Sequence, residues 1–134
     1  LIPADGLVAV HDGVRPFVTA AVIEACYTTA SQHGAGVAAV PLKDSIRHVQ
    51  ADGSNQALDR AAHRAIQTPQ TFQAKALKEA FATEESPHFT DDASVYEHAG
   101  GQIHLVEGSY ENIKLTTPED LLLAEVILQK QSPS

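Results

Sequence analysis

An aspartate and an arginine stand three residues apart in the segment VHDGVRP, at Asp12 and Arg15. The carboxylate could hold Mg²⁺, whose preference for oxygen ligands suits phosphate chemistry, and the guanidinium could bind a phosphate through two hydrogen bonds. In the structural alternative, Asp12 accepts backbone N–H groups of its own turn and Arg15 pairs with it. The spacing supports both interpretations equally.

The segment GSYENIKLTTPED places one lysine, Lys114, between apolar neighbours near the end of an expected strand. Such a lysine could hold a phosphate. From the residues alone, however, an edge-strand lysine that blocks aggregation is the favoured interpretation. Arg60 and Arg64 fall in a polar stretch, where a solvated surface position is the default expectation.

Three hydroxyl residues could donate hydrogen bonds to a phosphate, and each also has a structural interpretation as a turn, pre-proline or capping residue: Ser45, Thr68 and Thr90. The seven histidines lack metal-ligand spacing, which argues against a zinc site. The sequence also lacks a Walker loop and a nucleophile elbow.

The elements expected around Asp12 form a strand, helix, strand unit. Leu7–Val10 is an apolar, β-branched run that predicts a buried strand, and Gly36–Leu42 predicts another. A helix is expected between them over Ala20–His33, with Thr19 as its N-cap and Gly34 ending it. This order predicts an α/β protein with a parallel sheet, in which ligands bind beyond the carboxyl ends of the strands.

A protruding hairpin is expected over residues 43–67, because polar residues alternate with isolated apolar ones around the turn dipeptide Asp52-Gly53. Apolar periodicity then predicts a helix over Thr71–Phe81. A second helix is expected over Thr90–Ala99, capped by Thr90, followed by a strand over Ile103–Val106.

The last element is a helix from Pro118 to about Gln129, because Thr117 can cap it and proline suits its first position. Its apolar side chains are expected to supply core contacts: Leu121, Leu122, Ala124, Val126 and Leu128. Residues 131–134 are expected to form a disordered tail.

Length and composition limit the classes of protein. A chain of 134 residues fits one domain, and its net charge of −8 argues against nucleic acid or anionic membranes as partners. The single cysteine, Cys26, is expected to be a buried small hydrophobe, which favours an intracellular setting. The N-terminus, LIPADG, lacks an initiator methionine and a signal-peptide pattern, and we interpret the chain as cut from a longer one.

Five segments, in their order and spacing, resemble the 2-C-methyl-D-erythritol 4-phosphate cytidylyltransferase family: VHDGVRPF, PLKDSIR, QTPQTF, TDDAS and LVEGSYENIKLTTPEDLLLAE. The resemblance covers nearly the whole chain. It implies a Rossmann-like nucleotidyltransferase fold, with a mostly parallel sheet flanked by helices, and a cytoplasmic homodimer joined through the arms at 43–67. It also implies transfer of CMP from CTP to methylerythritol phosphate, with Mg²⁺ and release of pyrophosphate, in non-mevalonate isoprenoid synthesis.

The resemblance implies roles for individual residues. Asp12 would contact the methylerythritol moiety and lie near the metal, and Arg15 belongs to the same substrate-binding motif. Arg60, on the arm, and Lys114 would position the attacking phosphate, and Arg60 could serve the neighbouring subunit's site. Three hydroxyl residues match further substrate contacts: Ser45, Thr68 and Thr90.

The family's glycine-rich nucleotide loop is not in this sequence. The chain is therefore expected to be the C-terminal portion of a single cytidylyltransferase domain, inactive or nearly so alone, with exposed sheet edges and apolar surface. The nearest alternative is the sister family of D-ribitol 5-phosphate cytidylyltransferases, although TDDAS with Glu97 looks closer to the methylerythritol enzymes. An alternative of another class, a non-catalytic dimerisation or regulatory module with Asp12 as a phosphoacceptor, leaves the NIK and TPQ motifs without a role.

Overall fold

The structure is a computed structural model that describes residues 3, 5–82 and 90–131. Its centre is a four-stranded sheet in the order β1-β5-β2-β6, built from β1 (Leu7–Val10), β2 (Ala35–Pro41), β5 (Arg64–Gln73) and β6 (Leu105–Glu107). Strand β5 pairs antiparallel with both β1 and β2, and β2 pairs parallel with β6. The predicted α/β class is confirmed, but the sheet is mixed, not mostly parallel.

Strand β5 is the element that the sequence did not predict. It lies between β1 and β2, which run in the same direction, as the strand, helix, strand order predicts, but do not pair with each other because antiparallel β5 separates them. Residues 71–73, expected to begin a helix, are its last three residues. Pro69 lies within the strand and has no N–H for the ladder, and the pairing of β5 with β2 shifts register between Val37 and Ala39, opposite this proline. A proline inside a central strand is rare, which is why the pattern favoured other elements.

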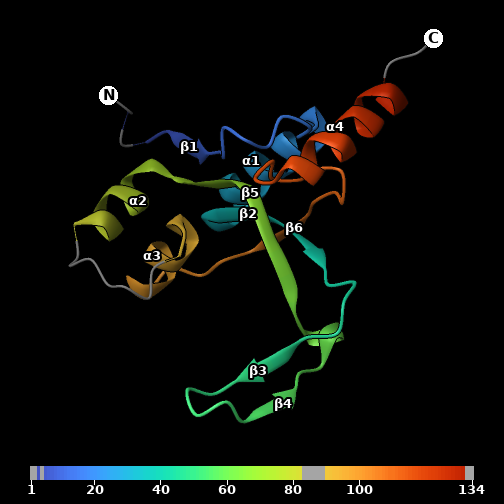
Figure 1. The fold of residues 1–134 in the computed structure, drawn as a ribbon. Helices are drawn as coiled ribbons and strands as arrows, with labels where there is room; N and C mark the ends of the chain where they lie inside the picture. The colour runs from blue at the N-terminus through green and yellow to red at the C-terminus, as the bar shows by residue number, and fades with distance from the viewer. Residues whose placement is uncertain (1–2, 4, 83–89, 132–134) are drawn as a thin grey trace.

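Helices cover both faces of the sheet, as Figure 1 shows. Helix α1 (Ala20–His33) has the predicted bounds: the Thr19 hydroxyl accepts a hydrogen bond from the backbone N–H of Val22 at 3.3 Å, and Gly34 ends the helix with φ of 99°. Helices α2 (Ala74–Phe81) and α3 (Asp92–His98) pack together on the other side. The strand expected at 103–106 is β6, two residues later at its start.

The two hydrophobic cores lie on opposite faces of β2. Val37 packs with Phe72 of β5 and with residues of α2 and α3, whereas Ala38 packs with Cys26 of α1. Alternation along a strand sends successive side chains to opposite faces. Gly36, on the α1 face, lets the helix approach closely, because a Cβ there would lie 2.5 Å from the Cys26 carbonyl oxygen. The core therefore fixes β2 and β5 between two helical layers.

The predicted hairpin is present and extends away from the sheet in Figure 1. Strands β3 (Arg47–Val49) and β4 (Asn55–Ala57) pair antiparallel, and every residue of both strands is exposed. A 3₁₀ turn at Arg60–Ala62 leads back into β5. Residues 64–67, expected to belong to the hairpin, are the start of β5, so we call residues 43–63 the arm from here on. Because β2 enters it and β5 leaves it, the arm is an insertion between two central strands.

Helix α4 (Pro118–Gln131) differs from its prediction. The Thr117 cap is confirmed, since its hydroxyl accepts from the backbone N–H of Asp120 at 3.3 Å. The expected core contacts are wrong: Ile127 is the helix's buried residue, whereas its leucines and Val126 are 47% to 66% exposed. Gln131, placed in the expected tail, ends the helix, and 132–134 lie outside the described residues. Within the described part of the chain, no helix is long and apolar enough to span a membrane.

Candidate functional site

The turn after β1 brings Asp12 and Arg15 together. The Arg15 Nε donates to Asp12 Oδ2 at 3.0 Å, and the backbone N–H of Arg15 donates to the Asp12 carbonyl at 3.1 Å. The Arg15 side chain is 12% exposed and the Asp12 side chain 32%. The guanidinium is thus largely withdrawn from solvent, whereas the carboxylate stays open to it. The ion pair of the structural alternative is therefore present in the fold.

Thr68 reaches the same turn from β5, the neighbour of β1 in the sheet. Its hydroxyl accepts a hydrogen bond from the backbone N–H of Asp12 at 3.0 Å and lies 2.9 Å from Nδ1 of His11. The residue is 9% exposed. Thr68 and Asp12 are 56 residues apart in sequence. The unpredicted antiparallel pairing of β1 with β5 is what brings them together.

Lys114 lies in the loop that leads from β6 to α4. Its Nζ is 3.7 Å from Asp12 Oδ2, and its side chain is half exposed. The backbone N–H of the next residue, Leu115, donates to the carbonyl of Val14 at 2.9 Å, which ties this loop to the Asp12 turn. The interpretation of Lys114 as an edge-strand residue is wrong, because the residue is in a loop. The structure instead places its ammonium beside the carboxylate.

A buried amide pair, missed by the sequence analysis, joins these segments. The Asn112 side chain, fully buried, donates through Nδ2 to the Thr68 carbonyl at 2.8 Å and to Gln67 Oε1 at 3.3 Å. Its backbone carbonyl accepts a hydrogen bond from Arg15 Nη1 at 2.7 Å. Gln67 Nε2 donates to the carbonyl of Ser109 at 2.8 Å. Asn112 therefore contacts both β5 and Arg15 from the loop that carries Lys114.

Three predicted residues lie elsewhere. In the described part of the chain, no hydrogen bond or ion pair joins Arg60, Ser45 or Thr90 to the Asp12 turn. Arg60 Nη1 donates to the Lys43 carbonyl at 2.6 Å at the base of the arm. Ser45 is exposed on the arm, and Thr90 is exposed before α3, with its hydroxyl 3.3 Å from that of Ser94.

The TDDAS segment forms the start of α3, with Asp91 instead of Thr90 as its N-cap. Asp91 Oδ1 accepts from the Ser94 backbone N–H at 2.8 Å and Oδ2 from Gln70 Nε2 at 3.0 Å. Partial burial raises the pKa of Asp91, but the hydrogen bonds from Ser94 and Gln70 outweigh it and hold the pKa below its ordinary value. Burial and the charge of Asp91 raise the pKa of Asp92. These contacts give Asp91 a structural role at the helix start.

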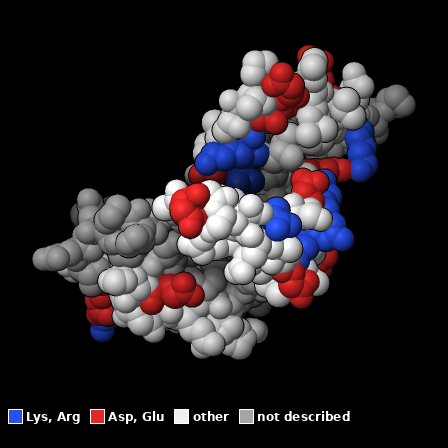
Figure 2. Space-filling view, turned by 60° about the horizontal axis from the view of Figure 1, so that its bottom comes forward, with Lys and Arg blue, Asp and Glu red and all other residues white. Residues whose placement is uncertain are grey.

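The charges around Asp12 suit an anionic ligand more than a metal cage of protein groups. In the residues that the structure describes, no cluster of three or more His, Cys, Asp or Glu side chains could hold a metal. Mg²⁺ is commonly held by one or two carboxylates together with substrate phosphates. The open Asp12 side chain can supply one of these carboxylates. Figure 2, viewed from the arm side, shows basic side chains in separate groups with acidic ones between them. The positive groups that pair with Asp12 in the described residues are Arg15 and Lys114.

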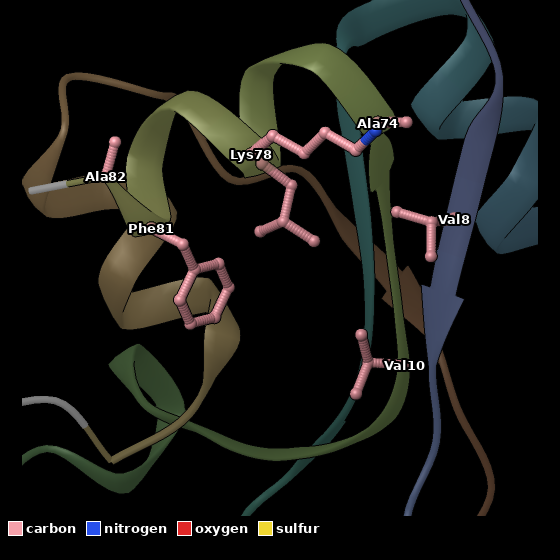
Figure 3. A pocket seen from close by; sticks show the side chains of 7 residues that line it. Val8, Val10, Ala74, Lys78, Phe81 and Ala82 are labelled. Carbon is pink, nitrogen blue, oxygen red and sulfur yellow. The ribbon is translucent and has the colours of Figure 1, made fainter. Parts of the chain in front are cut away.

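A separate apolar groove of about 460 Å³ lies between the side chains of β1 and α2, as Figure 3 shows. Its lining is Val8, Val10, Ala74, Leu77, Lys78, Phe81 and Ala82. Apolar side chains dominate the groove, so it is poorly suited to phosphate. Exposed apolar surface was expected from the sequence, and this groove and the leucines of α4 provide it, while β1 and β6 are the edge strands of the sheet among the described residues.

Fold and site together define an α/β protein with a polar cluster, suited to a phosphate ester, at the carboxyl end of a strand. The family model for 2-C-methyl-D-erythritol 4-phosphate cytidylyltransferase matches residues 1–130. The chain therefore belongs to the 2-C-methyl-D-erythritol 4-phosphate cytidylyltransferase family.

Curated relatives and solved structures agree with this assignment. A cytidylyltransferase of that name from Bacteroides thetaiotaomicron is 48% identical over 96% of this chain and 58% of its own length. One from Bacillus velezensis is 46% identical over 98% of this chain and 58% of its own length. A structure of 4-diphosphocytidyl-2C-methyl-D-erythritol synthase from Anaerococcus prevotii has a TM-score of 0.84 and 32% identity, covering 96% of this chain and 61% of that one. The chain thus spans about three fifths of these proteins.

Proposed function

We propose that this chain supplies the acceptor side of a cytidylyltransferase site that transfers CMP from CTP to 2-C-methyl-D-erythritol 4-phosphate. A phosphate oxygen of the alcohol phosphate would attack the α-phosphorus of CTP, and pyrophosphate would leave with the bonding electrons. The observation that carries the proposal is the meeting of Asp12, Arg15, Thr68 and Lys114 at one end of the sheet. Membership of the family supports the choice of substrates.

Lys114 is the group best placed to hold the attacking phosphate. Its ammonium is half exposed and 3.7 Å from Asp12, so it can turn to an incoming phosphate without leaving a buried charge unpaired. Arg15 is different, because two of its N–H groups are bound to Asp12 and to the Asn112 carbonyl. We infer that Arg15 orients the Asp12 carboxylate and that Lys114 neutralises the phosphate.

Asp12 would contact the methylerythritol moiety and, when Mg²⁺ is bound, share the ion with substrate phosphates. The metal would supply charge neutralisation during transfer between phosphates. Catalysis of this kind depends on in-line positioning and electrostatics more than on a covalent nucleophile. The role of this chain is accordingly to hold the acceptor in one orientation.

Arg60 and Ser45 would complete the site from the arm, and Thr90 would contact substrate from the start of α3. Among the described residues, Arg60 forms neither a hydrogen bond nor an ion pair with the Asp12 turn of its own chain. We therefore propose that the arm reaches the site of the neighbouring subunit in a homodimer. An Arg60→Ala protein is mixed with a Lys114→Ala protein, each in the intact enzyme. Recovered activity in the heterodimers is expected, and heterodimers as inactive as the parents would refute sharing.

The decisive experiment measures pyrophosphate release from CTP by the intact protein with each of two acceptors, methylerythritol phosphate and ribitol 5-phosphate. We expect turnover with the first, and Lys114→Ala is expected to lower it by about a hundredfold or more, as loss of a charge-neutralising group does. Preference for ribitol phosphate would contradict the proposal. The 134-residue chain alone, without the family's glycine-rich nucleotide loop, is expected to release almost no pyrophosphate, and measurable release would overturn that part.

A further inference from the structure

His11, which follows β1 directly, contacts the end of the Asp12 turn with one ring nitrogen and Thr68 of β5 with the other. Nε2 lies 2.9 Å from the backbone carbonyl oxygen of Arg15, and Nδ1 lies 2.9 Å from the hydroxyl of Thr68. Neither the substrate roles proposed above nor the family motif used for them gives this histidine a function. Its position suggests that it controls the geometry of the turn.

The partners of the ring determine which nitrogen carries the proton. A carbonyl oxygen can only accept, so the hydrogen bond to Arg15 requires a proton on Nε2. In the neutral imidazole, Nδ1 is then an acceptor, and the Thr68 hydroxyl must donate to it. The same hydroxyl accepts the backbone N–H of Asp12 at 3.0 Å. The hydrogen bonds therefore run in one direction, from Asp12 N–H to Thr68 to His11 to the Arg15 carbonyl.

We propose that His11 is a positioning residue that fixes the donor direction of the Thr68 hydroxyl and thereby the Asp12–Arg15 turn. The chain of hydrogen bonds holds the backbone at both ends of the turn, which carries the carboxylate and the guanidinium of the site. The effect of His11 on catalysis rests on the proposed function, because it assumes that the Asp12 turn binds the acceptor substrate.

A consequence follows for how Thr68 meets the substrate. Its hydroxyl proton is committed to His11 and one lone pair to the Asp12 N–H, which leaves one acceptor position. A substrate hydroxyl can donate to that position, whereas an ionised phosphate oxygen, which is also an acceptor, cannot. Thr68 therefore contacts an alcohol group of the acceptor substrate and leaves its phosphate to Lys114.

The proton position can be measured without enzymatic activity. Long-range ¹H–¹⁵N NMR of the 134-residue chain, at about pH 8.5 where imidazole rings are neutral, separates protonated from unprotonated ring nitrogens. His11 should carry its proton on Nε2. His63 is an internal control of the opposite kind, because its Nδ1 lies 2.6 Å from the Asp59 carbonyl and must carry the proton. A protonated Nδ1 at His11, assigned by the signals lost in His11→Gln, overturns the inference.

Two variants of Thr68 test the direction of its hydroxyl. Thr68→Val removes the donor, so the ¹⁵N signal of His11 Nδ1 should move away from the protonated range, whereas Thr68→Ser should leave it in place. Saturating the intact protein with methylerythritol phosphate should also leave that signal at the chemical shift of a hydrogen-bonded nitrogen. A move to the free position on addition of the substrate would show that Thr68 donates to substrate instead, which refutes the proposal.

Kinetics of the intact enzyme test the positioning role. His11→Phe should lower kcat/KM for the alcohol phosphate by about tenfold to a hundredfold, the usual effect of losing a residue that orients an active group, while KM for CTP stays unchanged. The double variant with Thr68→Val should lose little more than Thr68→Val alone, because the effect of His11 acts through the Thr68 hydroxyl. His33→Phe, on the exposed end of α1, is the matched control and should keep full activity. Additive losses would refute the coupling.

These results separate the two proposals. If the intact protein uses neither acceptor, the proposed function fails, but the NMR result still decides whether His11 directs the Thr68 hydroxyl. If the protein is active and His11 carries its proton on Nδ1, the inference about His11 fails alone.

Discussion

Replacing Asn112 by alanine should destabilise the fold by about 3 kcal/mol. The variant loses two hydrogen bonds, to the Thr68 carbonyl and to Gln67 Oε1, each worth about 1 kcal/mol net. Gln67 Oε1 keeps the Ser109 N–H, but the buried Thr68 carbonyl loses its side-chain donor, which costs about 1 to 3 kcal/mol more. Removal of Asn112 Oδ1, buried with no partner among the described residues, offsets part of that loss.

Urea unfolding followed by circular dichroism measures this change. With a slope of about 2 kcal/mol per molar urea, a loss of this size lowers the midpoint by roughly 1.5 M. The control is Asn55→Ala, at an exposed position of β4, which should change stability by less than about 0.5 kcal/mol. A loss below about 1 kcal/mol for Asn112→Ala would show that the amide pair does not hold the loop to β5.

Two further predictions concern titratable groups. Burial raises the pKa of Cys26 from 9.0 to about 11, so the thiol of the unfolded chain ionises at lower pH than that of the folded chain. The free energy of unfolding should therefore fall by up to about 2.7 kcal/mol as pH rises from 9 to 11. The free energy of unfolding of Cys26→Ala should lack this slope, and an equal slope in the variant would contradict the assignment. Asp91→Ala should cost about 2 kcal/mol, because it removes the cap of α3 and the bond to Gln70. The pKa of Asp91 is lowered in the fold, so its stabilisation is present above pH 4 and lost on acidification, whereas Asp92→Asn should not destabilise near neutral pH. Thermal melts at pH 7 and pH 3 check both aspartates, and a cost for Asp91→Ala that is equal at the two pH values would refute the role of its charge.

Local signals in the sequence were sufficient where one element decides its own structure. Thr19 and Gly34 set the ends of α1, and Asp52-Gly53 set the turn of the arm, where Gly53 has φ of 90°. These residues act through hydrogen bonds and backbone angles within a few positions of themselves. The sequence therefore predicts them without knowledge of the remaining fold.

Features that depend on distant partners were missed. Strand β5 contains Pro69, and its pairing is possible because β2 changes register opposite it, which no pattern within 64–73 records. Asn112 and His11 are polar residues that would ordinarily be solvated. Their roles come from Thr68, more than forty residues away from either. The leucines of α4 satisfied the pattern of a core helix, yet they lie on the surface of this chain.

The way the arm is attached has a consequence for variation among related proteins. Pro41 and Arg64 are register partners at the ends of β2 and β5, so the two strands already face each other where the arm begins and ends. A short turn between antiparallel partners is enough to close such a pair. Insertions, deletions and sequence drift in the arm therefore leave the register of Thr68 unchanged. The exposed surface of the arm can therefore change while the strands that hold the residues around Asp12 keep their register.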